Sequence, residues 1–381
     1  MAIECTIEGA EVLMPHGWSD APLTLADGLI RDDTVRRRVN LSGYKVWPGI
    51  IDVHGDGFER HMAPRRGALR EAERGIVACA SELAANGVTT AVLAQFFSWE
   101  GGIRSPDFAE HVFQSVTEAQ GAVPIDLRLQ LRLETHLIDD FGRAKDAVDR
   151  FGIGYVVFND HLPHERLAEG RKPPRLTGQA LKAGRNPEAH FAFLKDLHAR
   201  GSEVPEAVAA LAHDLRKRGV VLGSHDDTTS GDVDLWSERG ASVSEFPETH
   251  EAAKAARARG AHIVLGAPNV VRGASHAGNI SASDLISEDL CDAIASDYHY
   301  PSPLRATLRL AELGICDLTK AWRLVSSGPA ALLGLTDRGA LTPGQRADVV
   351  VLDPNSNRIV ATLAEGQFAF LSGPVAERFM A

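Results

Sequence analysis

The sequence predicts a parallel (β/α)8 barrel of the TIM-like type, joined to a small β-sandwich built from both ends of the chain. From about residue 47 onward, short apolar runs alternate with helical segments, which is typical of a parallel sheet closed by crossover connections. Several of these runs also end in acidic residues or histidines. We expect strands at residues 50–56, 88–96, 127–136, 155–161, 220–227, 241–247, 262–269 and 291–298.

The two ends of the chain predict the second domain. Residues 1–46 and 338–381 both contain short runs of alternating apolar and polar residues. A chain of 381 residues suits a barrel of about 250 residues with an appendage. We therefore expect one small β-domain from residues 1–46 and 338–381, and a barrel over residues 47–337.

Helices are expected between the strands, for example at residues 68–86, 205–219 and 249–259. Gly87, Gly219 and Gly260 follow these stretches, where a residue free to adopt positive φ can end the last helical turn. The segment 143–206 is longer and rich in charge, proline and glycine. We expect an excursion or lid there, because connections of that length are usually functional or disordered.

Composition narrows the class of protein. The net charge of −11 argues against nucleic-acid binding, which needs a positive surface to neutralise phosphates. No apolar run approaches the roughly 20 residues that cross a bilayer, and the first residues lack the basic and apolar regions of a secretion signal. The four cysteines have no CxxC spacing, which indicates a reducing compartment. We expect a cytoplasmic protein that binds neither nucleic acid nor membrane.

The first barrel strand ends in a motif that begins a metal site. In the run Trp-Pro-Gly-Ile-Ile-Asp-Val-His-Gly-Asp at 47–56, His54 and Asp56 point to the same side as Asp52. Side chains two apart share a face of a strand, so Ile51 and Val53 face the other way. The apolar file can then pack on helices while the polar file lines the mouth of the barrel.

Ligand-type residues recur at the ends of later strands: Glu134, Asp160, His161, His225 and Asp297. A parallel barrel presents the C-terminal ends of all its strands on one rim, so residues far apart in sequence meet there. Neutral imidazoles with carboxylates suit zinc, manganese or iron. A single such histidine is more often a hydrogen-bonded core residue, but the recurrence at five strand ends predicts a metal centre.

These residues resemble the amidohydrolase superfamily, through PGxxDxH at the first strand, the later His and Asp strand ends, and the split β-domain that ends in GxxADVVVLD. Within it, the chain is more similar to the PhnM-type enzymes, the α-D-ribose 1-methylphosphonate 5-triphosphate diphosphatases of the carbon–phosphorus lyase pathway. The resemblance rests on HGDGFERHMAPRRG, SHDDTT, EFPETHEAA, GAPNVVRGASHAGN and SDYHYPSPL, spread over residues 54–305.

The resemblance implies an enzyme of phosphonate metabolism that hydrolyses a ribose 5-triphosphate to the 5-phosphate and pyrophosphate at two divalent metal ions, zinc or manganese, with iron as a further candidate. Carried over, His54 and Asp56 would hold one metal, Glu134 would bridge, His161 and His225 would hold the other, and Asp297 would contact metal and nucleophile and act as the catalytic acid and base. Two features depart from the superfamily pattern. Asp56 stands where a second histidine is usual, and Glu134, His161 and His225 fall one strand earlier than usual, so that either a strand is missing from the count or the site is rearranged.

A triphosphate must be held by positive or polar groups, because phosphoryl transfer relies on positioning and charge stabilisation. The candidates near predicted rim loops are Arg60, His61, Arg65, Asn269, Arg272, His276 and Asn279. Arg65 is equally well explained as a surface charge. Asp160 and Asp227 are expected to support the metal ligands through hydrogen bonds, although a helix N-cap role is about as likely for the Asp/Thr cluster in the SHDDTT motif, to which Asp227 belongs.

Two other functions remain open from the sequence. The same metal site would serve a metal-dependent deacetylase acting on a phosphorylated small molecule, but the Arg, His and Asn set favours a polyphosphate. A non-catalytic scaffold should have lost metal ligands, whereas all six candidate positions hold competent side chains. The expected partner is a phosphorylated small molecule, and the oligomeric state is left open, with a homodimer as one option.

Overall fold

The computed structural model describes residues 2–63, 72–273 and 280–381. Within them, eight strands form one sheet in the order β15-β14-β13-β12-β11-β10-β9-β8. Their bounds are β8 (Ile50–Gly55), β9 (Val88–Phe97), β10 (Asp126–Glu134), β11 (Tyr155–Asn159), β12 (Val221–His225), β13 (Val243–Glu245), β14 (His262–Gly266) and β15 (Ala293–Ala295). The pairs β8–β9, β10–β11, β11–β12, β12–β13 and β14–β15 are parallel. Each of the eight predicted strands is confirmed.

Backbone hydrogen bonds join the first and last strands of this sheet. The amide of Asp297 donates to the carbonyl of His54 at 3.0 Å, and the amide of Asp56 donates to the carbonyl of Asp297 at 2.9 Å. Gly55 and Asp297 thereby form a parallel bridge. The eight strands therefore make a nearly closed barrel, as the sequence predicts.

Alternation explains why β10 suits a barrel wall. Leu127, Leu129, Leu131 and Leu133 are buried, and so are Gln130, Arg132 and Glu134, which occupy the alternate positions. Successive side chains on a strand point to opposite faces, so one face supplies an apolar file and the other a polar file. The polar file places Glu134 at the C-terminal end of the strand.

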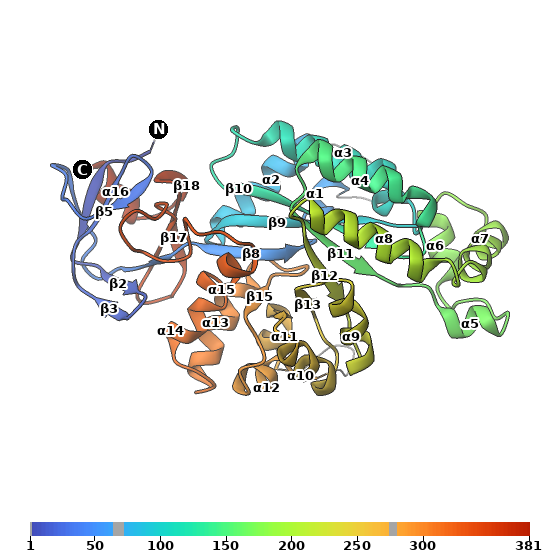
Figure 1. The fold of residues 1–381 in the computed structure, drawn as a ribbon. Helices are drawn as coiled ribbons and strands as arrows, with labels where there is room; N and C mark the ends of the chain where they lie inside the picture. Colours follow the sequence, from blue (N-terminus) through green and yellow to red (C-terminus); the bar gives the residue numbers. More distant parts are fainter. Residues whose placement is uncertain (1, 64–71, 274–279) are drawn as a thin grey trace. The chain divides into compact units, whose positions relative to one another are not determined.

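Two further sheets are built from the ends of the chain. The four-stranded sheet, of order β5-β4-β1-β6, consists of β1 (Cys5–Glu8), β4 (Leu23–Ala26), β5 (Leu29–Arg31) and β6 (Arg38–Asn40). The six-stranded sheet, of order β18-β17-β16-β7-β2-β3, consists of β2 (Glu11–Met14), β3 (Gly17–Ser19), β7 (Lys45–Pro48), β16 (Val349–Leu352), β17 (Ile359–Ala364) and β18 (Gln367–Leu371). Figure 1 shows segments from both ends of the chain in these sheets.

A single apolar core joins these two sheets. Cys5, Ile7 and Leu25 from the four-stranded sheet pack in one cluster with Val349 and Leu363 from the six-stranded sheet. The prediction of a β-sandwich from both termini is thus confirmed. The predicted boundaries at residues 46/47 and 337/338 stay a prediction, and β7 runs across the first of them.

The chain forms two compact units. The first, Met1–Leu93, Glu118–Arg128 and His262–Ala381, contains the terminal sheets, β8, β14 and β15. Its helices are α1 (Glu59–Met62), α2 (Ala72–Ala85), α11 (Ala267–Arg272), α12 (Ala282–Ser287), α13 (Ser302–Glu312), α14 (Leu318–Arg323), α15 (Ser327–Leu332) and α16 (Val375–Met380). Gly87 follows α2 with a φ of 84°, as predicted.

The second unit, Ala94–Thr117 and Leu129–Ala261, contains β11, β12, β13 and most of β10. Its helices are α3 (Pro106–Ala119, whose last two residues fall in the first unit), α4 (Phe141–Phe151), α5 (His164–Ala168), α6 (Leu176–Lys182), α7 (Pro187–Ala199), α8 (Val204–Lys217), α9 (Ser230–Glu238) and α10 (His250–Ala258), with short 3-10 turns at Gly102–Arg104 and Ile138–Asp140. In Figure 1, α3 and α4 lie side by side, and Arg143 on α4 donates to Asp107 and Glu110 on α3.

The predicted excursion at residues 143–206 needs correction. Residues 143–151 belong to α4, and the buried run Tyr155–Asn159 forms β11, so the long connection begins only after that strand. It is neither a loop nor disordered, because it folds into α5, α6 and α7. Asn186 caps α7 by accepting a hydrogen bond from the Glu188 amide, which is why helix forms after the Gly-Arg turn.

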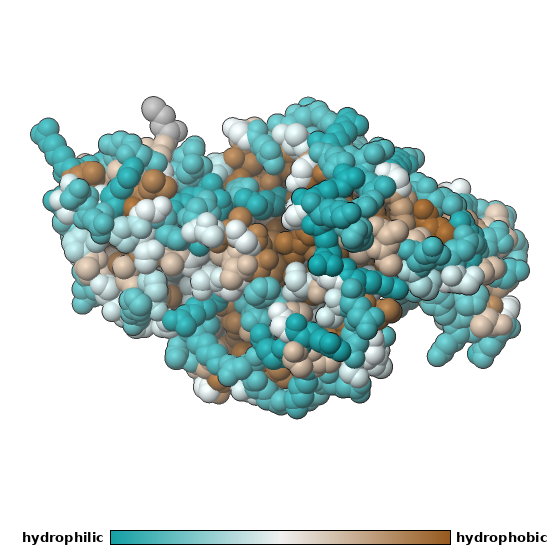
Figure 2. Space-filling view, viewed as in Figure 1, coloured by the Kyte–Doolittle hydropathy of each residue, from teal (hydrophilic) through white to brown (hydrophobic). Residues whose placement is uncertain are grey.

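Polar residues predominate on the visible surface of α3 and α4 (Figure 2). Among the described residues, no helix combines the length and apolar character needed to span a membrane.

Candidate metal centre

The first unit holds three of the predicted ligands, His54, Asp56 and Asp297. His54 is fully buried at the end of β8. A Cβ on Gly55 would lie 2.9 Å from Oδ2 of Asp52 and 3.0 Å from Oγ of Ser296. Contacts that short require a neighbour to move, so only glycine fits between His54 and Asp56. The motif His-Gly-Asp is thus explained by close approach of the first and last strands.

Asp297 lies just after β15, and backbone hydrogen bonds to the end of β8 fix its position. It has a φ of 55°, a left-handed conformation that asparagine and aspartate tolerate better than most residues. Its amide and carbonyl are the groups bonded to His54 and Asp56. Just before it, Ser296 donates through its amide (2.9 Å) and Oγ (2.5 Å) to the buried carboxylate of Asp52. Burial raises the pKa of Asp52, although these hydrogen bonds act against the rise.

The second unit places Glu134 and His161 in direct contact. Glu134 is fully buried at the end of β10 and accepts hydrogen bonds from Nε1 of Trp99 (3.0 Å) and the amide of His161 (3.2 Å). Its Oε1 lies 2.5 Å from Nδ1 of His161. One ligand atom each of Glu100, Glu134 and His161 lie within 4.8 Å of one another. Burial lowers the pKa of His161, but the Glu134 carboxylate outweighs this effect and raises it.

His225, at the end of β12, lies beside a buried arginine. Nη2 of Arg132 is 3.0 Å from Nε2 of His225, while Nδ1 of His225 is 3.0 Å from Oδ2 of Asp226. The guanidinium of Arg132 stacks 3.8 Å from the ring centroid of Phe96. Burial lowers the pKa of His225, and Arg132 lowers it further. Both effects favour the neutral imidazole, the form that binds metals.

Sequence reasoning missed Glu245. This residue is fully buried at the end of β13 and stands directly opposite His225 in the register of the two strands. A ring nitrogen of His225 and a carboxylate oxygen of Glu245 lie within 4.8 Å of each other. Oε1 of Glu245 accepts hydrogen bonds from Gln130 and from the Tyr155 hydroxyl, both at 2.7 Å. Its signal in the sequence is the one that identified Glu134, an acidic residue at the end of a short strand.

Strained backbone follows two of these strand ends. Asp226 and Phe246 have φ values of 59° and 55°. A bulky residue such as phenylalanine rarely adopts positive φ, and strain of this kind gathers at functional sites. The amide of Asp226 also donates to the carbonyl of Glu245 at 2.9 Å. The backbone after β12 and β13 is therefore fixed where His225 and Glu245 project.

The two predicted supporting aspartates have different surroundings. Asp227 is buried and accepts hydrogen bonds from Oγ of Ser224 (2.5 Å) and Oγ of Ser244 (2.8 Å). The N-cap role predicted for the Asp/Thr cluster is confirmed, because Thr229 caps α9. Asp160 is partly exposed and contacts His164 and His136 rather than a predicted metal ligand. Asp227 thus ties β12 to β13, on which His225 and Glu245 stand.

Two of the predicted phosphate ligands are paired with Glu82 on α2. Arg60 donates to Glu82, and Nε2 of His61 lies 2.6 Å from Oε2 of the same residue. Arg60 also donates to the carbonyl of Tyr298 at 3.1 Å and lies over the Tyr300 ring. A role in phosphate binding would compete with these contacts, so it stays a prediction.

The remaining phosphate candidates come from the region after β14. Asn269 donates to the carbonyl of Ile280 (3.3 Å) and accepts from the amide of Ala282 (3.1 Å). Arg272 is exposed in the last turn of α11. Arg65, His276 and Asn279 lie outside the described residues, so their predicted roles stay untested.

The donor sets fit a divalent metal ion. The group of Glu100, Glu134 and His161 and the pair of His225 and Glu245 offer only imidazole nitrogens and carboxylate oxygens. These donors suit zinc or manganese, and the hydrogen bonds to Glu134 and Glu245 are of the kind that orients metal ligands. Glu134, His161 and His225 do stand on the third, fourth and fifth barrel strands, so the strand count from the sequence is correct.

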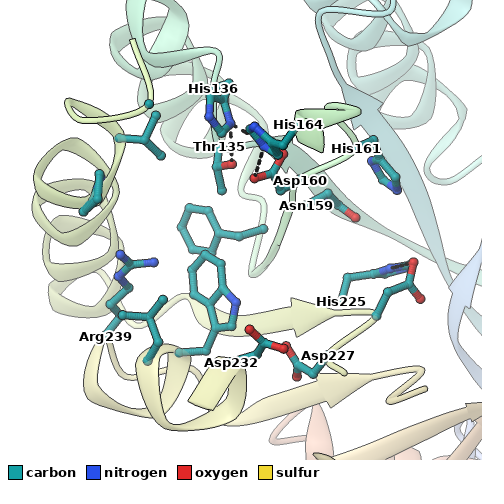
Figure 3. Close-up of a pocket in the computed structure, with 17 residues that line it drawn as sticks. Thr135, His136, Asn159, Asp160, His161, His164, His225, Asp227, Asp232 and Arg239 are labelled. Carbon is teal, nitrogen blue, oxygen red and sulfur yellow. Dashed lines mark hydrogen bonds and ion pairs between the residues drawn. The ribbon is translucent and has the colours of Figure 1, made fainter. Parts of the chain in front are cut away.

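A cavity of about 570 Å³ opens in the second unit, beside His161 and His225 (Figure 3). Phe158 and Trp236 stack on its wall, with ring centroids 5.1 Å apart. Arg239 lies over the Trp236 ring. His136, Asp160 and His164 form a separate group that lines the same cavity, as Figure 3 shows.

Comparison with known proteins finds both a matching family and a relative that is similar over most of the chain. The amidohydrolase family pattern matches residues 46–375. The chain is 33% identical over 321 residues to the α-D-ribose 1-methylphosphonate 5-triphosphate diphosphatase of Escherichia coli strain K12, covering 82% of this chain and 84% of that protein.

Solved structures agree on the fold. A putative prolidase from Bifidobacterium longum has a TM-score of 0.65 at 13% identity, covering 100% of this chain and 99% of that one. N-acetylglucosamine-6-phosphate deacetylase from Pasteurella multocida has a TM-score of 0.63 at 11% identity, covering 96% and 99%. At such identities the likeness concerns the fold alone. The extent of the family match, together with a relative 33% identical over most of both chains, establishes that the chain belongs to the amidohydrolase family.

Proposed function

We propose that this chain is a metal-dependent hydrolase that converts α-D-ribose 1-methylphosphonate 5-triphosphate to the 5-phosphate and pyrophosphate. The observation that carries the proposal is the 33% identity along 82% of the chain with a diphosphatase of that name. The buried carboxylates and imidazoles at the strand ends support it, because a member of the family could have lost the side chains that bind metal.

The metal set of this proposal is the one inferred from the sequence, enlarged by one residue. His54, Asp56, Glu134, His161, His225 and Asp297 are the predicted ligands, and Glu245 joins them. A divalent ion held by these residues would lower the pKa of its bound water toward neutrality and stabilise negative charge on phosphate oxygens. Zinc and manganese are the ions that these donors favour, with iron as a further candidate.

Side chains of the protein would orient the metal ligands and transfer protons to and from the reacting groups. Glu134 fixes the ring of His161, and Asp226 fixes the tautomer of His225 by facing its Nδ1, which leaves Nε2 as an acceptor. The Asp297 carboxylate would accept the proton of the attacking water and return it to the leaving pyrophosphate. Arg132 is a buried cation beside His225. It would hold negative charge with no reorganisation during reaction.

The decisive experiment measures pyrophosphate release by the metal-reconstituted full chain. The phosphonate triphosphate, a nucleoside triphosphate and an N-acetyl sugar phosphate are compared at equal concentration, with Glu134→Gln as the inactive control. Preferential release from the phosphonate substrate is expected. Cleavage of the nucleoside triphosphate alone would identify a different triphosphate as the substrate. Acetate release from the sugar would favour the deacetylase alternative.

Location and assembly are part of the same proposal. A cytoplasmic enzyme without nucleic-acid or membrane partners is what the sequence predicts, with a homodimer as one option. Light scattering on purified protein gives the oligomeric state directly.

A further inference from the structure

A second group of metal-binding side chains lies in the same unit, apart from the predicted metal ligands. His136 follows β10, Asp160 follows β11, and His164 begins α5. One ligand atom from each of the three lies within 4.8 Å of the other two. His136 is 6% exposed, whereas Asp160 and His164 are open to the cavity. Figure 3 shows the two imidazoles side by side above the Asp160 carboxylate.

The distances within this group suit a small cation. Nε2 of His164 is 3.0 Å from both carboxylate oxygens of Asp160, and Nδ1 of His136 is 3.5 Å from Oδ1 of Asp160. Ligand atoms about 2.0–2.2 Å from a tetrahedral zinc ion lie about 3.4 Å from one another. The distances from Asp160 to the two histidines are therefore close to those between ligands of such an ion.

His198 on α7 orients His164 from behind. Nδ1 of His198 lies 2.9 Å from Nδ1 of His164. Only one of two such nitrogens can be the donor, and when His164 donates, its Nε2 carries a lone pair toward Asp160. A lone pair facing a carboxylate at 3.0 Å is repulsive unless a proton or a metal ion lies between them. Metal-binding histidines typically have their other nitrogen held in this way by a hydrogen bond.

A buried polar side chain also lines the cavity beside this group. Asn159, which is 2% exposed, lines the cavity next to Asp160. Its Oδ1 has no hydrogen-bond partner among the described residues. A buried carbonyl oxygen without a partner is costly, and ordered water or an ion commonly satisfies it.

We propose that His136, Asp160 and His164 form an additional divalent transition-metal site, of the zinc type, separate from the centre predicted around Glu134, His161 and His225. Two imidazoles and one carboxylate are a common donor set for zinc, and open coordination positions would face the cavity. The other charged residues that line the cavity are mainly acidic: Asp226, Asp227 and Asp232. A metal ion here would give the cavity a positive group able to bind an anionic ligand. The site does not depend on the proposed reaction.

The test counts zinc ions in the full chain. Chelator-stripped protein is titrated with Zn²⁺, and bound metal is measured by mass spectrometry of the dialysed protein. His164→Gln and His136→Asn should each bind one equivalent less than the parent chain. His213→Gln, which replaces an exposed histidine on α8 of the same unit, should keep the full count. Circular dichroism melts confirm that each variant is folded.

Two more variants separate this site from the predicted centre. Glu134→Gln should lose metal at its own site yet keep the equivalent that His164→Gln removes. His198→Gln should weaken zinc binding at the new site by about 10- to 100-fold, the usual effect of losing a group that orients a ligand. Unchanged zinc content in both His164→Gln and His136→Asn would overturn the proposal and leave a protonated His164 paired with Asp160.

Discussion

Oε1 of Glu134 lies 2.5 Å from Nδ1 of His161, although the two residues stand on successive barrel strands and are separated by 27 positions. The parallel register of β10 and β11 creates this contact, because it pairs Glu134 with Asn159, two residues before His161. The fully buried carboxylate also accepts hydrogen bonds from Trp99 and from the His161 backbone. Glu134 thus holds both the ring and the backbone of His161 in place.

Glu134→Gln should remove both metal and activity. The amide is nearly isosteric but neutral, and it cannot supply the charge that a divalent ion needs. We expect turnover to fall by at least about 100-fold, since a metal ion contributes several kcal/mol of charge stabilisation. Metal content and pyrophosphate release are measured on the same sample. Trp99→Phe, which removes a single hydrogen bond to Glu134, should have a smaller effect on both, and equal losses in the two variants would argue for general disruption.

The sequence predicted the strands and most of the strand-end residues because both depend on local patterns. Alternation in the run at 127–134 and the apolar run at 155–159 set the strands, and polar residues at their ends mark the rim. The glycine in the His-Gly-Asp motif was visible too, but its reason, close approach to Asp52 and Ser296, requires the folded barrel.

What the sequence could not predict depends on contacts between strands. The pairing of His225 with Glu245 follows from the register of β12 and β13, and no local pattern encodes that register. The contact of His61 with Glu82 likewise depends on how α1 packs on α2. Helix formation after β11 was missed because proline and glycine suggested a loop, whereas they mark the starts and ends of short helices.

Asp297→Asn should leave metal bound and abolish most turnover. Asparagine tolerates the left-handed backbone that Asp297 adopts, so the fold should be unaffected. Loss of a group that transfers protons typically lowers kcat by about 10²- to 10⁴-fold. A matched control exists in Asp289→Asn, because Asp289 has nearly the same φ, 59°, and pairs with Lys320. Near-normal kcat in the Asp297 variant would exclude it from proton transfer.

Arg272→Ala should chiefly raise KM for the triphosphate. Arg272 is exposed in the last turn of α11, where its guanidinium is accessible to an anion from solvent. Losing one charged hydrogen bond of about 1.5–3 kcal/mol corresponds to roughly 10- to 100-fold in KM. The effect should shrink as salt rises, because exposed charges are screened. Arg378→Ala removes an exposed arginine from the last turn of α16 and should change neither constant; the phosphate role fails if both variants behave alike.

The capping box of α9 predicts a pH-dependent contribution to stability. Oγ1 of Thr229 accepts from the amide of Asp232 at 3.1 Å, and Oδ2 of Asp232 accepts from the amide of Thr229 at 2.9 Å. Burial opposes the charged carboxylate of Asp232, but the hydrogen bonds from Thr229 and Thr228 outweigh it and lower its pKa. A lowered pKa in the folded state means that the stabilisation is complete above the unfolded value of about 3.9 and is lost as pH falls through the folded value.

Thr229→Ala should therefore destabilise α9 by about 1 kcal/mol at neutral pH, the usual effect of losing an N-cap. Asp232→Asn should remove the part of the acid-dependent loss that comes from this carboxylate, so that its stability falls less between about pH 5 and pH 3 than that of the parent chain. Hydrogen exchange of the α9 amides, followed by mass spectrometry, measures both effects locally.

Thr249 is a matched control, since it caps α10 by accepting from the amide of Ala252. Thr249→Ala should loosen α10, whereas Thr229→Ala loosens α9. Equal exchange of α9 in Thr229→Ala and the parent chain would mean that the capping box does not set the stability of this helix.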